Sequence, residues 1–169
     1  MGGAARHKHK VLWTVLSVLL FFGVIAVGYA GIQVRKTVVN ESRGAISLSS
    51  EFYESGDGVV EISAEEFSAL VNEKKSFLLF GHTLSCPMGM PLTALTKELA
   101  EKYKISIVSL DRENFEKAGL SSRIKFLPTM VVYFEGEEIT HLDGEKDEDL
   151  SAYKTVEGLE NWVKKYVKI

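Results

Sequence analysis

From Val59 onward, apolar and polar residues follow a regular pattern that predicts a series of strands and helices. Short apolar runs bounded by turn residues are typical of strands, and apolar positions three and four residues apart are typical of helices. The pattern predicts strands at 59–62, 76–80, 105–110, 129–134 and 138–142, and helices at 63–75, 87–103, 111–118 and 156–166. The predicted order of elements is therefore β-α-β-α-β-α-β-β-α.

Local signals support this order. Ser63 and Glu66 form the S-x-x-E pattern of a capping box, which predicts a helix start. The run SFLLF at 76–80 is continuously apolar, as in a strand buried on both faces. Alternating strands and helices predict a parallel sheet covered on both faces, and the turn at 135–137 adds an antiparallel hairpin at one edge. We expect an α/β fold with a central mixed β-sheet flanked by helices.

The N-terminal part of the chain has a different pattern. Residues 11–30 form a run of 20 residues without a charge, and a bilayer core needs about 20 such residues. Trp13 and Tyr29 lie near its ends, where aromatic rings favour the membrane interface. We therefore expect a transmembrane helix or signal anchor at 11–31. The alternatives are a buried core helix and a signal peptide cleaved near Ala30.

The charges divide along the chain in a way that supports a membrane location. Residues 1–36 carry five Lys and Arg and no acid, whereas the rest carries 15 Lys and Arg against 23 Asp and Glu. An acidic body argues against a nucleic-acid partner. Slightly more positive charge precedes the apolar run than follows it, which favours a cytoplasmic N-terminus and an extracytoplasmic C-terminal domain. The expected partner of residues 11–31 is the lipid bilayer.

These patterns predict four segments. Residues 1–10 form a basic cytoplasmic N-terminus, 11–31 the membrane helix, 32–58 a linker, and 59–169 the folded domain. The linker prediction rests on the Ser, Gly and charged residues of 32–58, within which Phe52 and Tyr53 indicate a short packed piece. The acidic residues at 143–149 lack the spacing of an EF-hand and are interpreted as a solvated loop.

A single cysteine limits the chemistry that this chain can perform. One cysteine excludes an intrachain disulfide and multi-cysteine zinc or iron–sulfur sites, and we expect neither a metal nor another cofactor. Cys86 follows a predicted buried strand and stands at a predicted helix start, where the helix dipole stabilises a thiolate. The alternative is that Cys86 is a small buried apolar residue. Pro128 directly precedes an apolar strand, which is a position for a strand start or edge.

The order of elements and two motifs over residues 59–169 resemble the thioredoxin-like family. Cys86-Pro87-Met88-Gly89 stands where that family has its C-x-x-C redox motif, and Leu127-Pro128-Thr129 matches the segment that contains its cis-proline. The resemblance implies that Cys86 is the nucleophile and that Pro128 is cis and lies beside the thiol. It also implies that the backbone around Leu127 and Thr129, together with Pro87 and Met88, contacts an extended peptide by strand addition.

The sequence also departs from the family pattern. Gly89 occupies the position of the resolving cysteine, Ser85 replaces the usual aromatic residue, and Phe80 replaces a buried acid. The helix-kinking proline comes earlier than usual, at Pro91. His82 is a candidate modulator of the Cys86 thiol, although a lone loop histidine more often has no such role.

The loss of the second cysteine changes the expected reaction. Thiol–disulfide exchange proceeds through a mixed disulfide, and without a resolving thiol in the same loop that adduct persists until another thiol attacks it. We therefore expect monothiol exchange with a cysteine-containing client protein or a small thiol, and no fast dithiol reductase activity. The alternative is a non-catalytic binding or accessory module for a membrane or exported protein.

Overall fold

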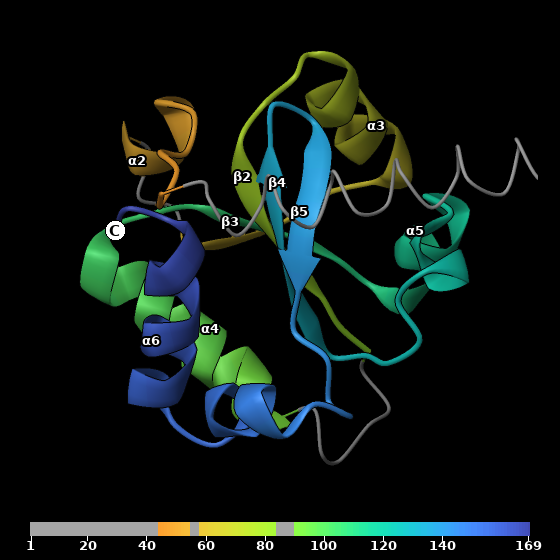
Figure 1. The fold of residues 1–169 in the computed structure, drawn as a ribbon. Helices are drawn as coiled ribbons and strands as arrows, with labels where there is room; N and C mark the ends of the chain where they lie inside the picture. Colours follow the sequence, from red (N-terminus) through yellow and green to blue (C-terminus); the bar gives the residue numbers. More distant parts are fainter. Residues whose placement is uncertain (1–43, 55–57, 84–89) are drawn as a thin grey trace, which may run out of the picture. The chain divides into compact units, whose positions relative to one another are not determined.

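A five-stranded mixed sheet organises the part of the chain that the computed structural model describes, residues 44–54, 58–83 and 90–169 (Figure 1). The strands are β1 (Val59–Glu61), β2 (Phe77–Gly81), β3 (Ile107–Leu110), β4 (Thr129–Phe134) and β5 (Glu137–His141). Their order in the sheet is β1-β3-β2-β4-β5. β3 runs parallel to both β1 and β2, whereas β4 is antiparallel to β2 and to β5. The predicted mixed sheet with an antiparallel hairpin at one edge is confirmed.

Helices cover both faces of this sheet. The longer ones are α3 (Ala64–Asn72), α4 (Met90–Tyr103) and α6 (Val156–Tyr166), and the short ones are α2 (Glu51–Glu54), α5 (Arg112–Lys117) and the 3-10 helices η1 (Leu120–Ser122) and η2 (Asp147–Tyr153). Figure 1 shows α4 and α6 together on one side of the sheet, and α3 and α5 on the other. The part of the chain that the structure describes contains no helix long and apolar enough to span a bilayer. The predicted span at 11–31 lies outside the described residues.

Local sequence signals act as predicted at the start of α3. The Ser63 hydroxyl accepts the backbone N–H of Glu66 at 3.2 Å, and the Glu66 carboxylate accepts that of Ser63 at 2.7 Å. Two N–H groups that the helix leaves without partners are thereby satisfied, which is the physical basis of the capping box. The third predicted strand, by contrast, begins two residues late, because Ser106 donates its N–H to the carbonyl of Phe52 instead of to the sheet.

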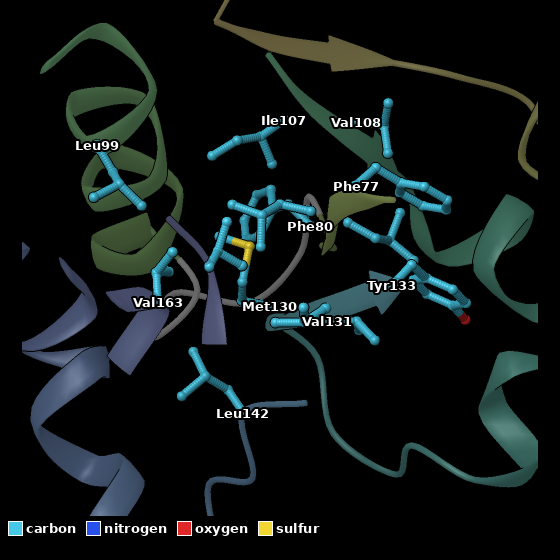
Figure 2. Packing of buried hydrophobic residues seen from close by; sticks show 14 of the residues in the cluster. Phe77, Phe80, Leu99, Ile107, Val108, Met130, Val131, Tyr133, Leu142 and Val163 are labelled. Atoms are coloured by element: carbon cyan, nitrogen blue, oxygen red, sulfur yellow. The ribbon is translucent and has the colours of Figure 1, made fainter. Parts of the chain in front are cut away.

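Aromatic residues from β2, β4 and α3 pack together in the core. The rings of Phe77 and Tyr133 are stacked, with centroids 4.8 Å apart and an angle of 4° between their planes. Phe67 meets Tyr133 edge-on at 5.5 Å. Figure 2 shows Leu99 of α4 and Val163 of α6 beside the buried side chains of the sheet. Such contacts add to the free energy gained by burying the rings themselves.

Residues 44–54 are an integral part of the folded unit, although they lie in the stretch interpreted as a linker. The N–H of Ile46 donates to the carbonyl of Tyr166 at 2.7 Å, and the N–H of Lys168 donates to the carbonyl of Ile46 at 2.7 Å. Ile46, Leu48 and Phe52 are buried in the core. The packed piece is therefore longer than Phe52 and Tyr53 alone, and it ties the start of the folded unit to its C-terminal end.

A carboxylate on α6 connects that helix to α4. Glu160 accepts hydrogen bonds from Lys102 Nζ at 2.5 Å, from the Tyr103 hydroxyl at 2.5 Å and from Lys164 Nζ at 2.6 Å. These bonds, led by the one from Lys102, stabilise the charged form and lower the pKa of Glu160 to about 2. The helix that follows the Cys86 segment is thus held against α6 by a charged network as well as by apolar packing.

Replacing Phe52 by alanine tests whether residues 44–54 belong to the core. We expect Phe52→Ala to lower the free energy of unfolding by about 3–5 kcal/mol, as is typical when a buried phenylalanine is removed. Urea unfolding followed by circular dichroism measures this change. The matched control is Phe126→Ala, because that side chain is 47% exposed and its removal should cost less than about 1 kcal/mol. Equal effects of the two substitutions would contradict a structural role for the segment.

The Glu160 network predicts a specific pH dependence of stability. Since folding lowers the pKa of Glu160 from 4.5 to about 2, its contribution is complete above pH 4.5 and is lost as the pH falls towards 2. We expect Glu160→Gln to be less stable than the parent protein at neutral pH and the difference to shrink below pH 4.5. Urea unfolding over this pH range measures it, with Glu101→Gln on the exposed face of α4 as the control. A difference that does not change with pH would contradict the assignment.

Candidate functional site

The cis-proline segment stands at the start of β4, where hydrogen bonds join it to the end of β5. The Leu127–Pro128 peptide bond is cis, as the resemblance implies. The next residue, Thr129, is fully buried and donates its hydroxyl to the carbonyl of Leu142 at 2.8 Å. Leu142 in turn donates its N–H to the carbonyl of Met130 at 2.8 Å. These bonds tie the start of β4 to the end of β5, so the segment before Pro128 has a defined position on the sheet.

Gly81 ends β2 directly beside this segment. It pairs with Thr129 of β4 on one side and with Leu110 of β3 on the other. A Cβ atom at Gly81 would lie 2.7 Å from the Phe115 ring and 2.8 Å from the Leu127 side chain, closer than real Cβ atoms come. The absence of a side chain at this position lets α5 and the cis-proline segment both approach the end of β2. The chain then leaves the sheet here towards Cys86, five residues further on.

The first residues beyond the sheet place an imidazole on an apolar surface. His82 is half-buried, and its ring stacks on Phe80 with centroids 5.5 Å apart. The backbone N–H of His82 donates to the Leu110 carbonyl at 3.0 Å. Phe80, only 1% exposed, pairs in register with the buried Ser109. Neither of these two side chains ionises near neutral pH. The position that holds a buried acid in the resembling proteins is therefore apolar in the structure as well as in the sequence.

A carboxylate close to His82 is committed to capping a helix. Asp111 accepts the backbone N–H of Asn114 at 2.8 Å and the side-chain amide of Asn114 at 3.0 Å, and it begins α5. The hydrogen bond from the backbone N–H of Asn114 is the main cause of a lowered pKa for Asp111, and the bond from the Asn114 side chain adds to it. Asp111 thus orients α5, the helix that supplies Phe115 to the Gly81 contact.

A small cavity of about 100 Å³ opens between residues 123–126, which precede the cis-proline segment, and residues 141–145 at the end of β5. Its wall includes Phe126, whose side chain is 47% exposed although it is a large apolar residue. Beside the cavity, the Glu138 carboxylate forms an ion pair with Arg123 at 3.1 Å, and its other oxygen lies 3.0 Å from His141 Nδ1. The lining residues are Arg123, Ile124, Lys125, Phe126, His141, Leu142, Asp143 and Glu145. The sequence analysis missed this cavity because the run 124–127 does not show which of its apolar residues is exposed.

The acidic segment 143–149 is more ordered than predicted. Asp149 is only 5% exposed, and its carboxylate accepts the backbone N–H of Asp143 at 3.0 Å. Burial, together with the charges of Asp149 and Asp143, raises the pKa of Tyr153 to about 12. The interpretation as a solvated loop is therefore wrong for Asp149, which closes a turn beside the cavity, and the segment continues into η2.

The structure places only some of the predicted site residues. Leu127, Pro128 and Thr129 lie together at the start of β4, and His82 lies at the end of β2. Cys86, Pro87, Met88 and Gly89 lie outside the described residues, so their predicted roles stay predictions. In the described ranges, no group of three His, Cys, Asp or Glu side chains is arranged to hold a metal ion.

Comparisons with known proteins agree with this architecture. The thioredoxin of Schistosoma mansoni superposes with a TM-score of 0.51 at 22% identity, covering 67% of this chain and 99% of its own. A mutant thioredoxin from Halobacterium salinarum gives a TM-score of 0.50 at 16% identity, covering 68% and 96%. At these identities the likeness establishes the fold alone. The comparison with curated proteins gave no significant match.

A family model provides the remaining evidence. The model described as thioredoxin matches residues 58–155, which is more than half of the chain. The matched range runs from the start of β1 to the end of η2, and it contains the cis Leu127–Pro128 bond, the β4–β5 hairpin and the position of Cys86. The chain therefore belongs to the thioredoxin family.

Proposed function

We propose that this chain exchanges thiols and disulfides through Cys86 as its single nucleophile. The observation that supports this proposal best is the cis Leu127–Pro128 bond beside Gly81, the residue at which the chain leaves β2 towards Cys86. We infer that an extended client segment pairs with the backbone before β4, where Leu127 and Pro128 are half-buried, as in other cases of strand addition. The predicted helix start at Cys86 favours the thiolate, which is the reactive form.

The proposed reaction proceeds in steps that balance. The Cys86 thiolate attacks one sulfur of a client disulfide, so that a new S–S bond joins Cys86 to the client and the other client sulfur leaves as a thiolate. A small external thiol then attacks the Cys86 sulfur and releases the second client thiolate. A second small thiol regenerates Cys86. Two external thiols are thus oxidised to their disulfide, and one client disulfide is reduced to two thiols.

Gly89 makes the second step intermolecular. A resolving cysteine in the same loop acts at an effective concentration that a dissolved thiol does not reach. With glycine in that position, we infer that the mixed disulfide with the client is long-lived and is resolved by a small thiol or by a client cysteine. Phe80 and Ser109, which pair in register, also offer no carboxylate to exchange a proton with the thiol.

We further propose that residues 11–31 anchor the protein in the cell membrane as a single span. The N-terminus would lie in the cytoplasm and the thioredoxin-family domain outside it. The support is the uncharged apolar run with its basic, acid-free flank. Secretion after cleavage near Ala30 is the alternative. An extracytoplasmic location suits the chemistry, because disulfides persist in oxidising compartments.

The second candidate function is that of a binding or accessory module on the same scaffold. Gly89 favours it, because a domain that has lost its resolving thiol retains the peptide-binding edge near Pro128. In this case the client is held by non-covalent contacts and Cys86 is dispensable.

Trapping mixed disulfides in cells distinguishes the two functions. We expect non-reducing gels to show adducts of the full chain that disappear on reduction and are lost, by more than about tenfold, in Cys86→Ser, because only a thiolate attacks a disulfide. The matched control is the double variant Ser85→Cys, Cys86→Ser, which keeps one thiol but moves it by one residue. We expect it to form far fewer adducts than the parent protein.

Two results would contradict thiol exchange. One is equal adduct formation by the relocated cysteine, which indicates unspecific oxidation. The other is the absence of adducts from the parent protein under conditions in which it is folded and present at the same level as Cys86→Ser.

A further inference from the structure

The cavity beside the cis-proline segment combines an exposed apolar ring with a defined position next to the peptide-binding edge. Phe126 stands two residues before Pro128, and its side chain is one of two exposed large apolar side chains in the described part of the chain; the other is Val60 on β1. Covering an exposed aromatic ring with an apolar group is favourable, at about 25 cal/mol for each Å² removed from water. An extended segment that pairs near Leu127 would bring one of its side chains to this cavity.

The wall opposite Phe126 is strongly acidic. Segment 143–149 contains five acids and one lysine, which gives it a formal charge of −4. Asp143 and Glu145 line the cavity itself, and Glu145 is exposed. Of the two lining cations, Arg123 is already paired with Glu138 at 3.1 Å, which leaves Lys125 against the acidic segment. The net field at this end of the sheet is therefore negative.

We propose that this cavity selects client segments in which an apolar residue stands beside lysine or arginine. The inference rests on the proposed function and names its substrate class: an extended segment of a cationic client protein. Phe126 contacts the apolar side chain, while Asp143, Glu145 and the rest of the acidic segment attract the basic one. Electrostatic complementarity of this kind raises association rates and discriminates against partners of the wrong sign. Acidic peptides and nucleic acids are disfavoured by the same charge.

The test uses peptide binding, so that it does not depend on thiol chemistry. Two cysteine-free peptides are compared that share the same apolar residues and differ only in carrying two lysines or two glutamates. Isothermal titration calorimetry is performed with the full chain in an uncharged detergent. We expect the lysine peptide to bind about tenfold more tightly at low salt and the preference to diminish at high salt, because exposed charges are screened.

Two substitutions with matched controls locate the binding. Glu145→Lys should reduce the preference for the lysine peptide by about fivefold, whereas Glu98→Lys on the exposed face of α4 should leave it unchanged within about twofold. Phe126→Ala should lower the affinity for the lysine peptide by about tenfold. Val60→Ala, at the other exposed apolar side chain, should leave this affinity unchanged. All four residues are exposed, so folding is expected to survive each change, and circular dichroism verifies it.

Several results would overturn this inference. Equal affinity for the two peptides, no measurable binding of the lysine peptide, or equal effects of Glu145→Lys and Glu98→Lys would each do so. Concentration-dependent self-association that Phe126→Ala abolishes would assign the cavity to a second copy of the chain instead. Cys86→Ser should bind the lysine peptide as the parent protein does. If the chain fails to exchange thiols but still prefers the lysine peptide to the glutamate peptide, the proposed reaction is refuted and the proposed binding site is not.

Discussion

The antiparallel pairing of β2 with β4 is the contact on which the rest of this structure depends. It joins the parallel part of the sheet to the hairpin, and it stacks Phe77 on Tyr133 in the centre of the core. At its other end it sets Gly81 against Thr129, so that the strand leading to Cys86 ends beside the cis-proline segment. The packing of the core and the geometry of the site therefore both depend on the register of β2 against β4. A shift of this register by one residue would move every side chain of the strand to the opposite face of the sheet.

Buried hydrogen bonds connect the start of β4 to the acidic segment 143–149 at the surface. The hydroxyl of Thr129 binds the carbonyl of Leu142, and the next residue, Asp143, donates its N–H to the buried Asp149. Buried polar groups need such partners, because leaving one unsatisfied costs about 1–3 kcal/mol. The acidic segment is consequently folded back beside the cavity that Phe126 borders. The negative charge of the acidic segment therefore lies near the backbone before β4, where an extended client is proposed to pair.

The protein shares the fold of the thioredoxin family, but several residues at its site differ from those that perform the family's dithiol reaction. The cis-proline, the hairpin and the cysteine position belong to that scaffold, whereas Gly89, Phe80 and Ser85 depart from the residues that support a dithiol cycle in the resembling proteins. Without a second cysteine, the roles proposed for this scaffold are to hold a client by a slowly resolved mixed disulfide or by contacts alone.

The pattern of apolar and polar residues was sufficient to predict the class of fold and the order of its main strands and helices. The class of fold and the order of elements follow from local causes, apolar periodicity and signals such as the Ser63 capping box. The cis state of Pro128 is expected only because Leu127-Pro128-Thr129 resembles the segment of the thioredoxin-like family that contains a cis-proline. Only the tertiary structure decided that residues 44–54 complete the core, that Asp149 is buried, and that Phe126 is exposed while Ile124 is buried two residues away. The burial of Ile46 depends on a partner far away in the chain, Tyr166, and the local pattern of polar and apolar residues carries no information about which distant partner will be present.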